Sequence, residues 1–363
     1  MKAGRLLSLD VLRGFDMLFI MGGCPLALAL CAAFGAPDGA LARQFRHVPW
    51  EGLAFKDMIF PLFLFIAGAS FPFSAAKRLA QGATRAALVG HVLRRGVALA
   101  VLGLCYNGLL AFDFAHLRVF GVLQLIGFAW TVAALLAIGF ERRARLVLAL
   151  ALLLGPSALF WLVGAPDFPD AAPFTPEGNL GCWVDRTLWG GHILQPRFDP
   201  EGTAGLLASP ATALLGVLAG DVLRSSLSGA RKAAALFLSG VLLVVAGLAL
   251  SPVVPVVKAL WSASFVLVTG GCSAMLLGAF YFALDVKGWR RGAMFFRVIG
   301  MNALTIYLAQ RGVDFGKVSA FLWGGAVRLL PPDGRPVGMA LAYLATCWLL
   351  LYFLYRKGIF LKV

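Results

Sequence analysis

The chain has 363 residues, of which 60% are hydrophobic and 13% charged, and its formal net charge is +15. A soluble domain of this size needs far more charge on its surface, so the composition excludes an ordinary soluble enzyme. A basic chain can also be a nucleic-acid-binding protein, but the positions of the charges described below indicate membrane orientation instead. We therefore expect no nucleic-acid partner.

Apolar runs of about 18 to 25 residues recur along the chain, which is the length at which a helix spans a hydrocarbon core of about 30 Å. They predict membrane helices at roughly 12–33, 57–76, 92–112, 118–139, 144–164, 206–223, 233–251, 260–284, 293–312 and 338–356. No linker divides them, so we expect an all-α, polytopic membrane bundle of about ten helices in a single domain, 1–363. The stretch 314–330 is also apolar, and we interpret it as a re-entrant or interfacial helix, because an eleventh span would export the basic tail 355–357.

Charges alternate between the two sides of this arrangement. One side receives Lys2, Arg5, Lys77, Arg78, Arg85, Arg94, Arg95, Arg142, Arg143, Arg145, Arg224, Arg231, Lys232, Lys287, Arg290, Arg291, Arg297, Arg356, Lys357 and Lys362. The other side receives Asp38, Glu51, Asp113, Asp167, Asp170, Glu177, Asp185, Asp199, Glu201 and Asp333. Cytoplasmic loops carry the excess of Lys and Arg in membrane proteins, so this asymmetry predicts cytoplasmic N- and C-termini. The first apolar run lacks a small-residue cleavage site, which favours a retained helix over a signal peptide.

The first span begins with three charged residues. Asp10 and Arg13 are three positions apart, so they share a helix face and can pair. Asp16 lies deeper, where a central carboxylate costs about 2.5 to 3.5 kcal/mol on an insertion scale. These residues are either a structural ion pair that anchors the helix or part of a functional site.

The predicted outer loop 34–56 contains His47, one of four histidines in the chain. The neighbouring Arg46 favours a neutral imidazole, which is the form that a general base needs, and Glu51 or Asp57 could orient it. The alternative is an interfacial belt, in which Trp50 lies at headgroup depth with a histidine beside it.

The predicted outer loop 165–205 is long and contains aromatic and apolar residues, so we expect it to be ordered. Asp185, His192, Asp199 and Glu201 could form a lid that binds sugar hydroxyls or an amine. Alternatively, the carboxylates of this loop pair with its own arginines, Arg186 and Arg197.

Several polar residues lie in the predicted spans or at their ends: Asn107, Arg118, Gln124, Asn302, Gln310 and Arg311. Such residues usually face the interior of a bundle or a water-filled cavity. The six cysteines have no metal-binding or redox spacing, so we expect neither a metal site nor a disulfide framework.

Eight ordered segments carry a resemblance to a known family: LSLDVLRG (7–14), HVPWEG (47–52), DMIFPLFLFIAG (57–68), GVLQ (121–124), DR (185–186), DPEG (199–202), LWSASFVL (260–267) and GMNA (300–303). Together they resemble the transmembrane acetyltransferases related to heparan-α-glucosaminide N-acetyltransferase, in particular the bacterial homologues. The lysosomal branch carries an Asn-Tyr-Gly-Gly-like stretch near the outer end of its first helix. This chain has Met21-Gly22-Gly23-Cys24 there, without the asparagine.

The resemblance implies transfer of an acetyl group from cytosolic acetyl-CoA to the amine of a glucosamine-type sugar on the outer side of a bacterial inner membrane. It implies that His47 is the active-site histidine, and it implies a homodimer. We expect Asp57 to orient His47. The residues expected to contact acetyl-CoA are Arg13, Arg118, Gln124 and Asn302, and those expected to contact the acceptor are Trp50, Glu51, Asp185, His192, Asp199 and Glu201.

Two other classes of function remain open at this point. An amino-sugar permease or uptake accessory protein could use the same outer carboxylates and buried polar residues without catalysis. A purely structural membrane protein would explain the helices, but it leaves Asp16, Asn302 and the polar outer loops without a purpose.

Overall fold

The computed structural model describes residues 6–361, and over this range it contains nine helices that are long and apolar enough to cross a membrane. A tenth span results if two helices bent by 64° are counted together. The spans are α1, η1 and α2 (Leu7–Leu18, Phe19–Gly23, Cys24–Ala33), α4 (Phe55–Ala80), α5 (Arg85–Asn107), α6 (Val122–Gly139), α7 (Arg142–Leu162), α9 (Thr203–Arg224), α10 (Gly229–Leu250), α11 with η3 (Ala263–Tyr281, Phe282–Val286), the bent pair α12 and α13 (Ala293–Met301, Ala303–Gly312), and η4 with α15 (Pro332–Gly334, Arg335–Lys357). The predicted all-α polytopic bundle is confirmed.

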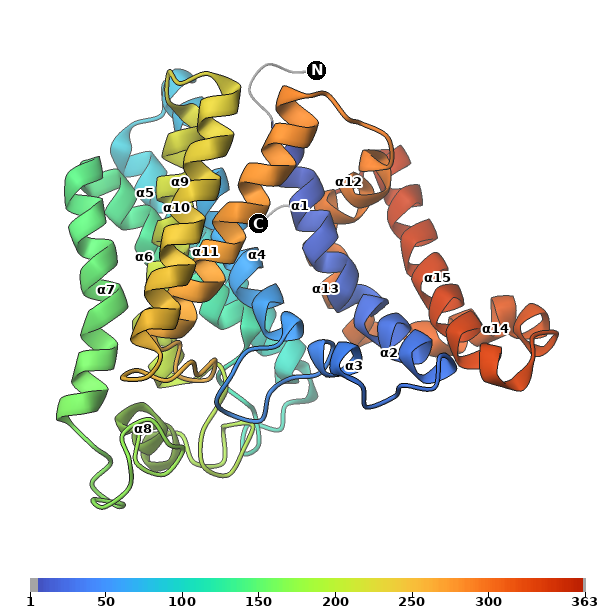
Figure 1. Cartoon of the computed structure of the whole chain (residues 1–363), viewed down its shortest axis with the longest axis horizontal. Helices are drawn as coiled ribbons and strands as arrows, with labels where there is room; N and C mark the ends of the chain where they lie inside the picture. Colours follow the sequence, from blue (N-terminus) through green and yellow to red (C-terminus); the bar gives the residue numbers. More distant parts are fainter. Residues whose placement is uncertain (1–5, 362–363) are drawn as a thin grey trace.

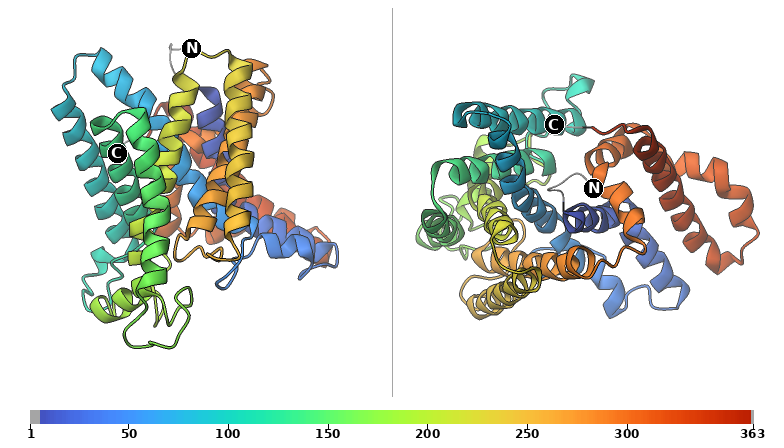
Figure 2. Two further views of the ribbon diagram at one scale, coloured as in Figure 1. Left: turned by 60° about the vertical axis from the view of Figure 1, so that its left-hand side comes forward. Right: turned by 90° about the horizontal axis from the view of Figure 1, so that it is seen from above.

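The shorter helices lie in the connections: α3 (Ala40–Gln44), η2 (Leu109–Ala111), α8 (Leu180–Leu188) and α14 (Phe315–Arg328). α14 has 14 residues, so it is about 21 Å long and too short to cross a core of about 30 Å alone. It packs against α15 and projects sideways from the bundle, on the same side as α2 and α3 (Figures 1 and 2). This geometry suits the predicted interfacial or re-entrant segment.

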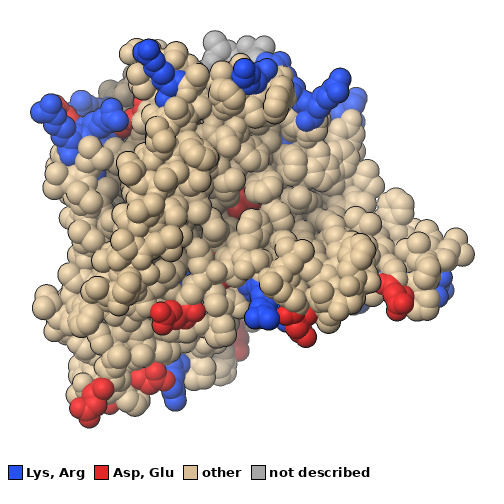
Figure 3. All heavy atoms as spheres, in the orientation of Figure 1, with Lys and Arg blue, Asp and Glu red and all other residues tan. Residues whose placement is uncertain are grey.

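The two ends of the bundle differ in charge. Lys and Arg gather at the end formed by the α4–α5, α9–α10 and α11–α12 turns, whereas Asp and Glu are prominent at the opposite end, around α8 and the long loops (Figure 3). We call these the basic end and the acidic end. The segregation matches the charge pattern of the sequence, and the cytoplasmic location of the basic end remains a prediction. Lys2, Arg5 and Lys362 lie outside the described residues.

Glycines let α4 and α9 approach closely at the centre of the bundle. A Cβ atom on Gly68 would lie 2.0 Å from the carbonyl oxygen of Ala213, and one on Gly216 would lie 2.1 Å from that of Phe65. Small residues permit this backbone contact between membrane helices, where packing rather than the hydrophobic effect drives association. The contact fixes α4, whose first turn carries Asp57.

Two spans are interrupted next to the centre of the molecule. The first span contains a π-helical turn at Phe19–Gly23, in which Gly22 has a φ of 156°. The Met21 carbonyl oxygen accepts a hydrogen bond from Gln310 Nε2 at 2.9 Å, which satisfies a backbone group near this distortion. The second interruption is at Asn302, where the chain bends by 64° between α12 and α13. Both interruptions lie beside the cavity described below.

Candidate active site

His47 and Asp57 form a hydrogen-bonded pair at the acidic end of the bundle. His47 lies in the loop after α3, and Asp57 lies in the first turn of α4. The distance between His47 Nδ1 and Asp57 Oδ1 is 2.6 Å, and the Asp57 side chain is only 1% exposed. Asp57 Oδ2 also accepts the backbone N–H groups of Val48 and Ala54, at 3.2 and 3.3 Å. A carboxylate is favoured here because the first N–H groups of a helix lack partners within the helix.

Lys258 completes this cluster from the segment between α10 and α11. Its Nζ atom lies 3.1 Å from Asp57 Oδ1 and 3.2 Å from His47 Nδ1. The backbone N–H of Gly52 donates to the carbonyl of Val256 at 2.8 Å, and this bond joins the two segments. Sequence reasoning missed Lys258. The available signal was an isolated lysine on the acidic side, just before the 260–267 motif.

The three groups together select one tautomer of His47. An ionised carboxylate only accepts hydrogen bonds and an ammonium only donates them, so the 2.6 Å contact requires a proton on His47 Nδ1. Lys258 then donates to Asp57. Nε2 of the neutral imidazole therefore carries a lone pair and can accept a proton. His47 is half exposed, so a substrate can reach this nitrogen.

A cavity of about 680 Å³ extends from this cluster toward the basic end. His47, Lys258 and Glu201 line it at the acidic end, and Arg13 and Arg95 line it farther toward the basic end. The walls between them are largely apolar and include Met17, Phe60, Phe63, Leu99, Trp130 and Leu304. The cavity therefore has polar groups at both ends and an apolar middle.

Two guanidinium groups face the cavity from the basic side. Arg13 Nη2 donates to Ser70 Oγ at 3.0 Å, and Arg13 forms the predicted ion pair with Asp10 at 3.8 Å. The Arg95 guanidinium lies over the Trp130 ring at 4.3 Å, and its buried Nε atom has no hydrogen-bond partner within residues 6–361. Sequence reasoning missed Arg95, although an arginine pair inside an apolar run was a usable signal.

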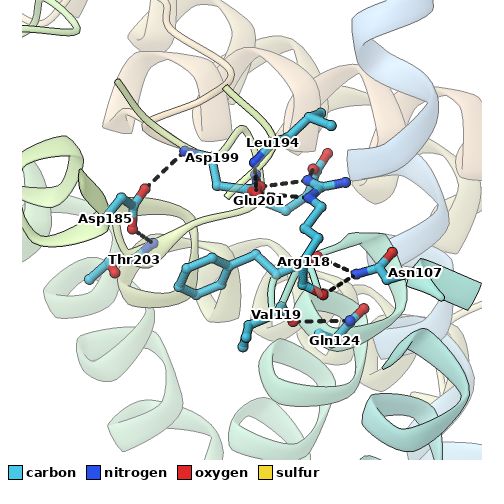
Figure 4. Close-up of polar contacts among 10 residues, drawn as sticks. Asn107, Arg118, Val119, Gln124, Asp185, Leu194, Asp199, Glu201 and Thr203 are labelled. Carbon is cyan, nitrogen blue, oxygen red and sulfur yellow. Dashed lines mark hydrogen bonds and ion pairs between the residues drawn. The ribbon is translucent and has the colours of Figure 1, made fainter. Parts of the chain in front are cut away.

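Arg118 joins the long outer loop to the bundle (Figure 4). Its Nε and Nη2 atoms donate to the two oxygens of Asp199 at 2.8 and 2.5 Å, and Nη2 also contacts Glu201. Burial alone lowers the pKa of Arg118, but the two carboxylates outweigh it and hold the pKa above its ordinary value. Burial also raises the pKa of Glu201, against the opposing effect of Arg118. The ion pair with Arg118 holds Glu201 at the cavity.

Asn107 and Gln124 hold the backbone on either side of this junction. Asn107 Nδ2 donates to the carbonyls of Arg118 and Phe120 at 2.9 and 2.6 Å, and Gln124 Nε2 donates to Val119 at 3.1 Å. Asp185 is 1% exposed and accepts the backbone N–H groups of Asp199 and Thr203 at 3.1 and 2.9 Å. Burial raises the pKa of Asp185. Its carboxylate organises the loop backbone.

The structure separates the residues predicted to contact the acceptor. Glu201 lines the cavity, whereas Asp199 is occupied by Arg118, and His192 Nδ1 contacts the Leu117 carbonyl at 2.9 Å. Trp50 packs edge-on against Phe198 at 4.9 Å and donates to the Phe174 carbonyl at 2.8 Å, so it ties the two outer loops together. Glu51 is exposed and forms a backbone bridge with Val257.

The alternative considered for the long loop, pairing of its carboxylates with its own arginines, is also present. Arg186 forms an ion pair with Asp167, and Arg197 forms one with Glu177. The loop therefore contains carboxylates of both kinds: Asp167 and Glu177 pair with its own arginines, whereas Glu201 lines the cavity.

Of the residues predicted to contact acetyl-CoA, Arg13 lines the cavity at the basic side, and Arg118 lies near the other end. Asn302 is buried, and its Nδ2 atom lies 3.3 Å from the Val298 carbonyl oxygen. Both chain neighbours of Asn302 line the cavity, and its Oδ1 atom is without a hydrogen-bond partner in the described part of the chain.

The fold and this centre define a polytopic helical membrane protein with a histidine–carboxylate pair at the mouth of an internal cavity. A family model described as heparan-α-glucosaminide N-acetyltransferase, catalytic, matches residues 5–173, which include His47 and Asp57 but not Lys258. The human protein named heparan-α-glucosaminide N-acetyltransferase is 28% identical over 420 aligned residues, which cover 99% of this chain and 60% of that protein. The mouse protein of the same name is 27% identical over 423 residues, covering 100% of this chain and 61% of that protein.

The chain is therefore similar to heparan-α-glucosaminide N-acetyltransferases along nearly its whole length, and the family model covers residues 5–173. It spans about three-fifths of the length of the curated relatives it matches.

Proposed function

We propose that the protein is an acetyltransferase that moves an acetyl group from acetyl-CoA, entering at the basic end, to the amine of a glucosamine-type sugar at the acidic end. The observation that carries this proposal is the position of His47 at one end of a cavity that reaches two arginines toward the other end. The names of the relatives support both the reaction and the sugar. The charge asymmetry supports a cytoplasmic basic end. A bacterial inner membrane as the location is part of the proposal and follows from the resemblance of the sequence alone.

The cavity suits the donor in size and chemistry. Its volume of about 680 Å³ lies within the usual range of roughly 300 to 1,000 Å³ for small-molecule sites. Arg13 and Arg95 supply planar cations for phosphate oxygens, and the unpartnered Nε of Arg95 is a donor without an acceptor. The apolar middle accommodates a long, weakly polar arm, and a thioester carried by that arm points toward His47.

His47 acts as the base in this mechanism. Its Nε2 atom accepts a proton from the acceptor amine as the new nitrogen–carbon bond forms and the carbon–sulfur bond breaks. The sulfur leaves as a thiolate, and His47 returns the proton to it. In a second route, His47 Nε2 attacks the thioester carbon and the thiolate leaves as the carbon–sulfur bond breaks. The amine then attacks the acetyl carbon, the bond from that carbon to Nε2 breaks, and the amine proton passes through Nε2 to the thiolate. Asp57 holds the required tautomer in both routes.

The oxyanion that develops on the acetyl carbonyl needs a hydrogen-bond donor. We propose Asn302 for this role, because its neighbours line the cavity. Gln124 could also donate, but only one of its chain neighbours, Leu123, lines the cavity, whereas both neighbours of Asn302 do. At the acceptor side, Glu201 is the carboxylate available to contact the sugar.

The test uses the purified protein in lipid nanodiscs, with labelled acetyl-CoA and glucosamine. Because positioned proton transfer contributes about 10² to 10⁴ in rate, His47→Ala should lower turnover by at least about a hundredfold. His116→Ala is a matched control, since His116 forms a similar but exposed contact with Asp113 at 3.0 Å. Near-normal turnover in the His47 variant would show that His47 is an interfacial residue.

The permease alternative is tested in the same preparation. Proteoliposomes that accumulate labelled glucosamine without acetyl-CoA, and that form no acetylated sugar when it is added, would favour transport over transfer.

A further inference from the structure

A second cavity, of about 260 Å³, lies at the basic end among five helices. Its apolar lining comes mainly from the end of α4 and the neighbouring turns of α5 and α6: Phe71, Pro72, Ala75, Ala76, Leu79, Leu88, Ala137 and Ile138. Its charged lining is Arg85, Arg145, Asp221 and Arg224. The α6–α7 turn stops short of the α4–α5 and α9–α10 turns, so this end of the bundle is recessed there (Figures 1 and 2).

The charges around this cavity are not balanced. Arg145 is committed to internal contacts, because it donates to Asp221 Oδ2 at 2.6 Å and to the Phe140 carbonyl at 2.9 Å. Arg85 and Arg224 are exposed and form no ion pair within residues 6–361. The cavity therefore carries two uncompensated positive charges next to an apolar wall.

The positions of these arginines favour an anionic group at the level of lipid headgroups. Arg85 is the first residue of α5 and Arg224 the last of α9, so both lie where helices end. Farther from this end of the bundle, α5 and α7 expose apolar side chains on their outer faces. The exposed fraction is 63% for Val97 and 66% for Val147. Basic pockets between membrane helices are suited to the headgroups of anionic lipids, and acyl chains would cover the apolar faces.

We infer that this cavity binds the phosphate of an anionic phospholipid such as phosphatidylglycerol. A zwitterionic headgroup fits less well, because its own cation opposes Arg85 and Arg224. The site is separate from the catalytic cavity, although Phe71 lines both. A lipid bound here therefore packs against one wall of the catalytic cavity, and it should raise the thermal stability of the protein.

The test compares nanodiscs of phosphatidylcholine with nanodiscs containing one-third phosphatidylglycerol, and reads both the thermal midpoint and the lipid retained in native mass spectra. Since each arginine near a membrane surface contributes about a fivefold gain in affinity, Arg85→Ala with Arg224→Ala should weaken retention of phosphatidylglycerol about 30-fold. The matched control is Arg142→Ala with Arg143→Ala, which removes the same charge from exposed positions that do not line the cavity. This control should retain the lipid.

A second variant keeps the test decisive if the double arginine variant misfolds. Ala76→Phe fills the cavity and leaves every arginine in place, and it should also release the lipid. Equal losses in the Arg142 and Arg143 control, or no loss in the other two variants, would overturn the inference. Inorganic phosphate that raises the midpoint as much as phosphatidylglycerol does would overturn it too, because the ligand would then be a soluble anion.

Discussion

Replacing Asp57 by Asn tests the proposed role of the carboxylate with little change in shape. Asp57 lies 2.6 Å from His47 Nδ1, and Lys258 lies 3.2 Å from the same nitrogen. At an effective dielectric constant of about 20, Asp57 attracts an imidazolium by about 6 kcal/mol, and Lys258 repels it by about 5 kcal/mol. The two effects nearly cancel. Asp57 therefore offsets the repulsion by Lys258 and also fixes the tautomer of His47, so its replacement should remove both effects.

An amide at position 57 can present its NH₂ group to Nδ1, which moves the imidazole proton to Nε2 and blocks the base. The same substitution in the Ser-His-Asp triad lowers kcat by about 10⁴ for this reason. We expect Asp57→Asn to lower kcat by about 10² to 10⁴, equivalent to about 3 to 5 kcal/mol in the barrier.

The assay is steady-state acetyl transfer from acetyl-CoA to glucosamine, with the thermal midpoint measured on the same preparation to separate lost chemistry from lost fold. Asp113→Asn is the matched control, because Asp113 contacts His116 on the surface. If Asp57→Asn keeps kcat within threefold of the parent at an unchanged midpoint, tautomer control is refuted.

Two further predictions concern the framework that holds the site. Gly68→Ala should lower the thermal midpoint by an amount equivalent to about 1 to 3 kcal/mol, since the new methyl group would lie 2.0 Å from a carbonyl oxygen of α9. A methyl group at Gly90 would meet no described residue beyond the backbone of its own helix within 4 Å, so Gly90→Ala should leave the midpoint equal or higher, and the opposite order would contradict the packing argument. Arg118→Met leaves the buried Asp199 carboxylate unpaired, which costs about 3 to 5 kcal/mol. It should speed proteolysis within residues 165–205, and an unchanged cleavage rate would show that Arg118 does not hold the loop.

The candidate site shows which contacts can be predicted from the spacing of residues along the chain and which cannot. His47 and Asp57 are ten residues apart, in a loop that runs directly into a helix, so their proximity was predictable from the chain. Lys258 is 201 residues from Asp57, and it reaches the pair only because the 250–258 segment bonds to the loop at Gly52. The ion pair of Arg118 with Asp199 likewise joins segments 81 residues apart.

The sequence by itself determined the membrane spans and the charge difference between the two ends of the bundle. Both depend on local composition, because each helix satisfies its own backbone hydrogen bonds and needs only enough apolar length to cross a bilayer. Only the tertiary structure decided which polar residues meet at the cavity. Asp185 and Glu201 looked equivalent in the sequence, but one is buried among backbone N–H groups and the other faces the cavity. That difference arises from the packing of segments far apart in the chain, which residue types and spacing do not specify.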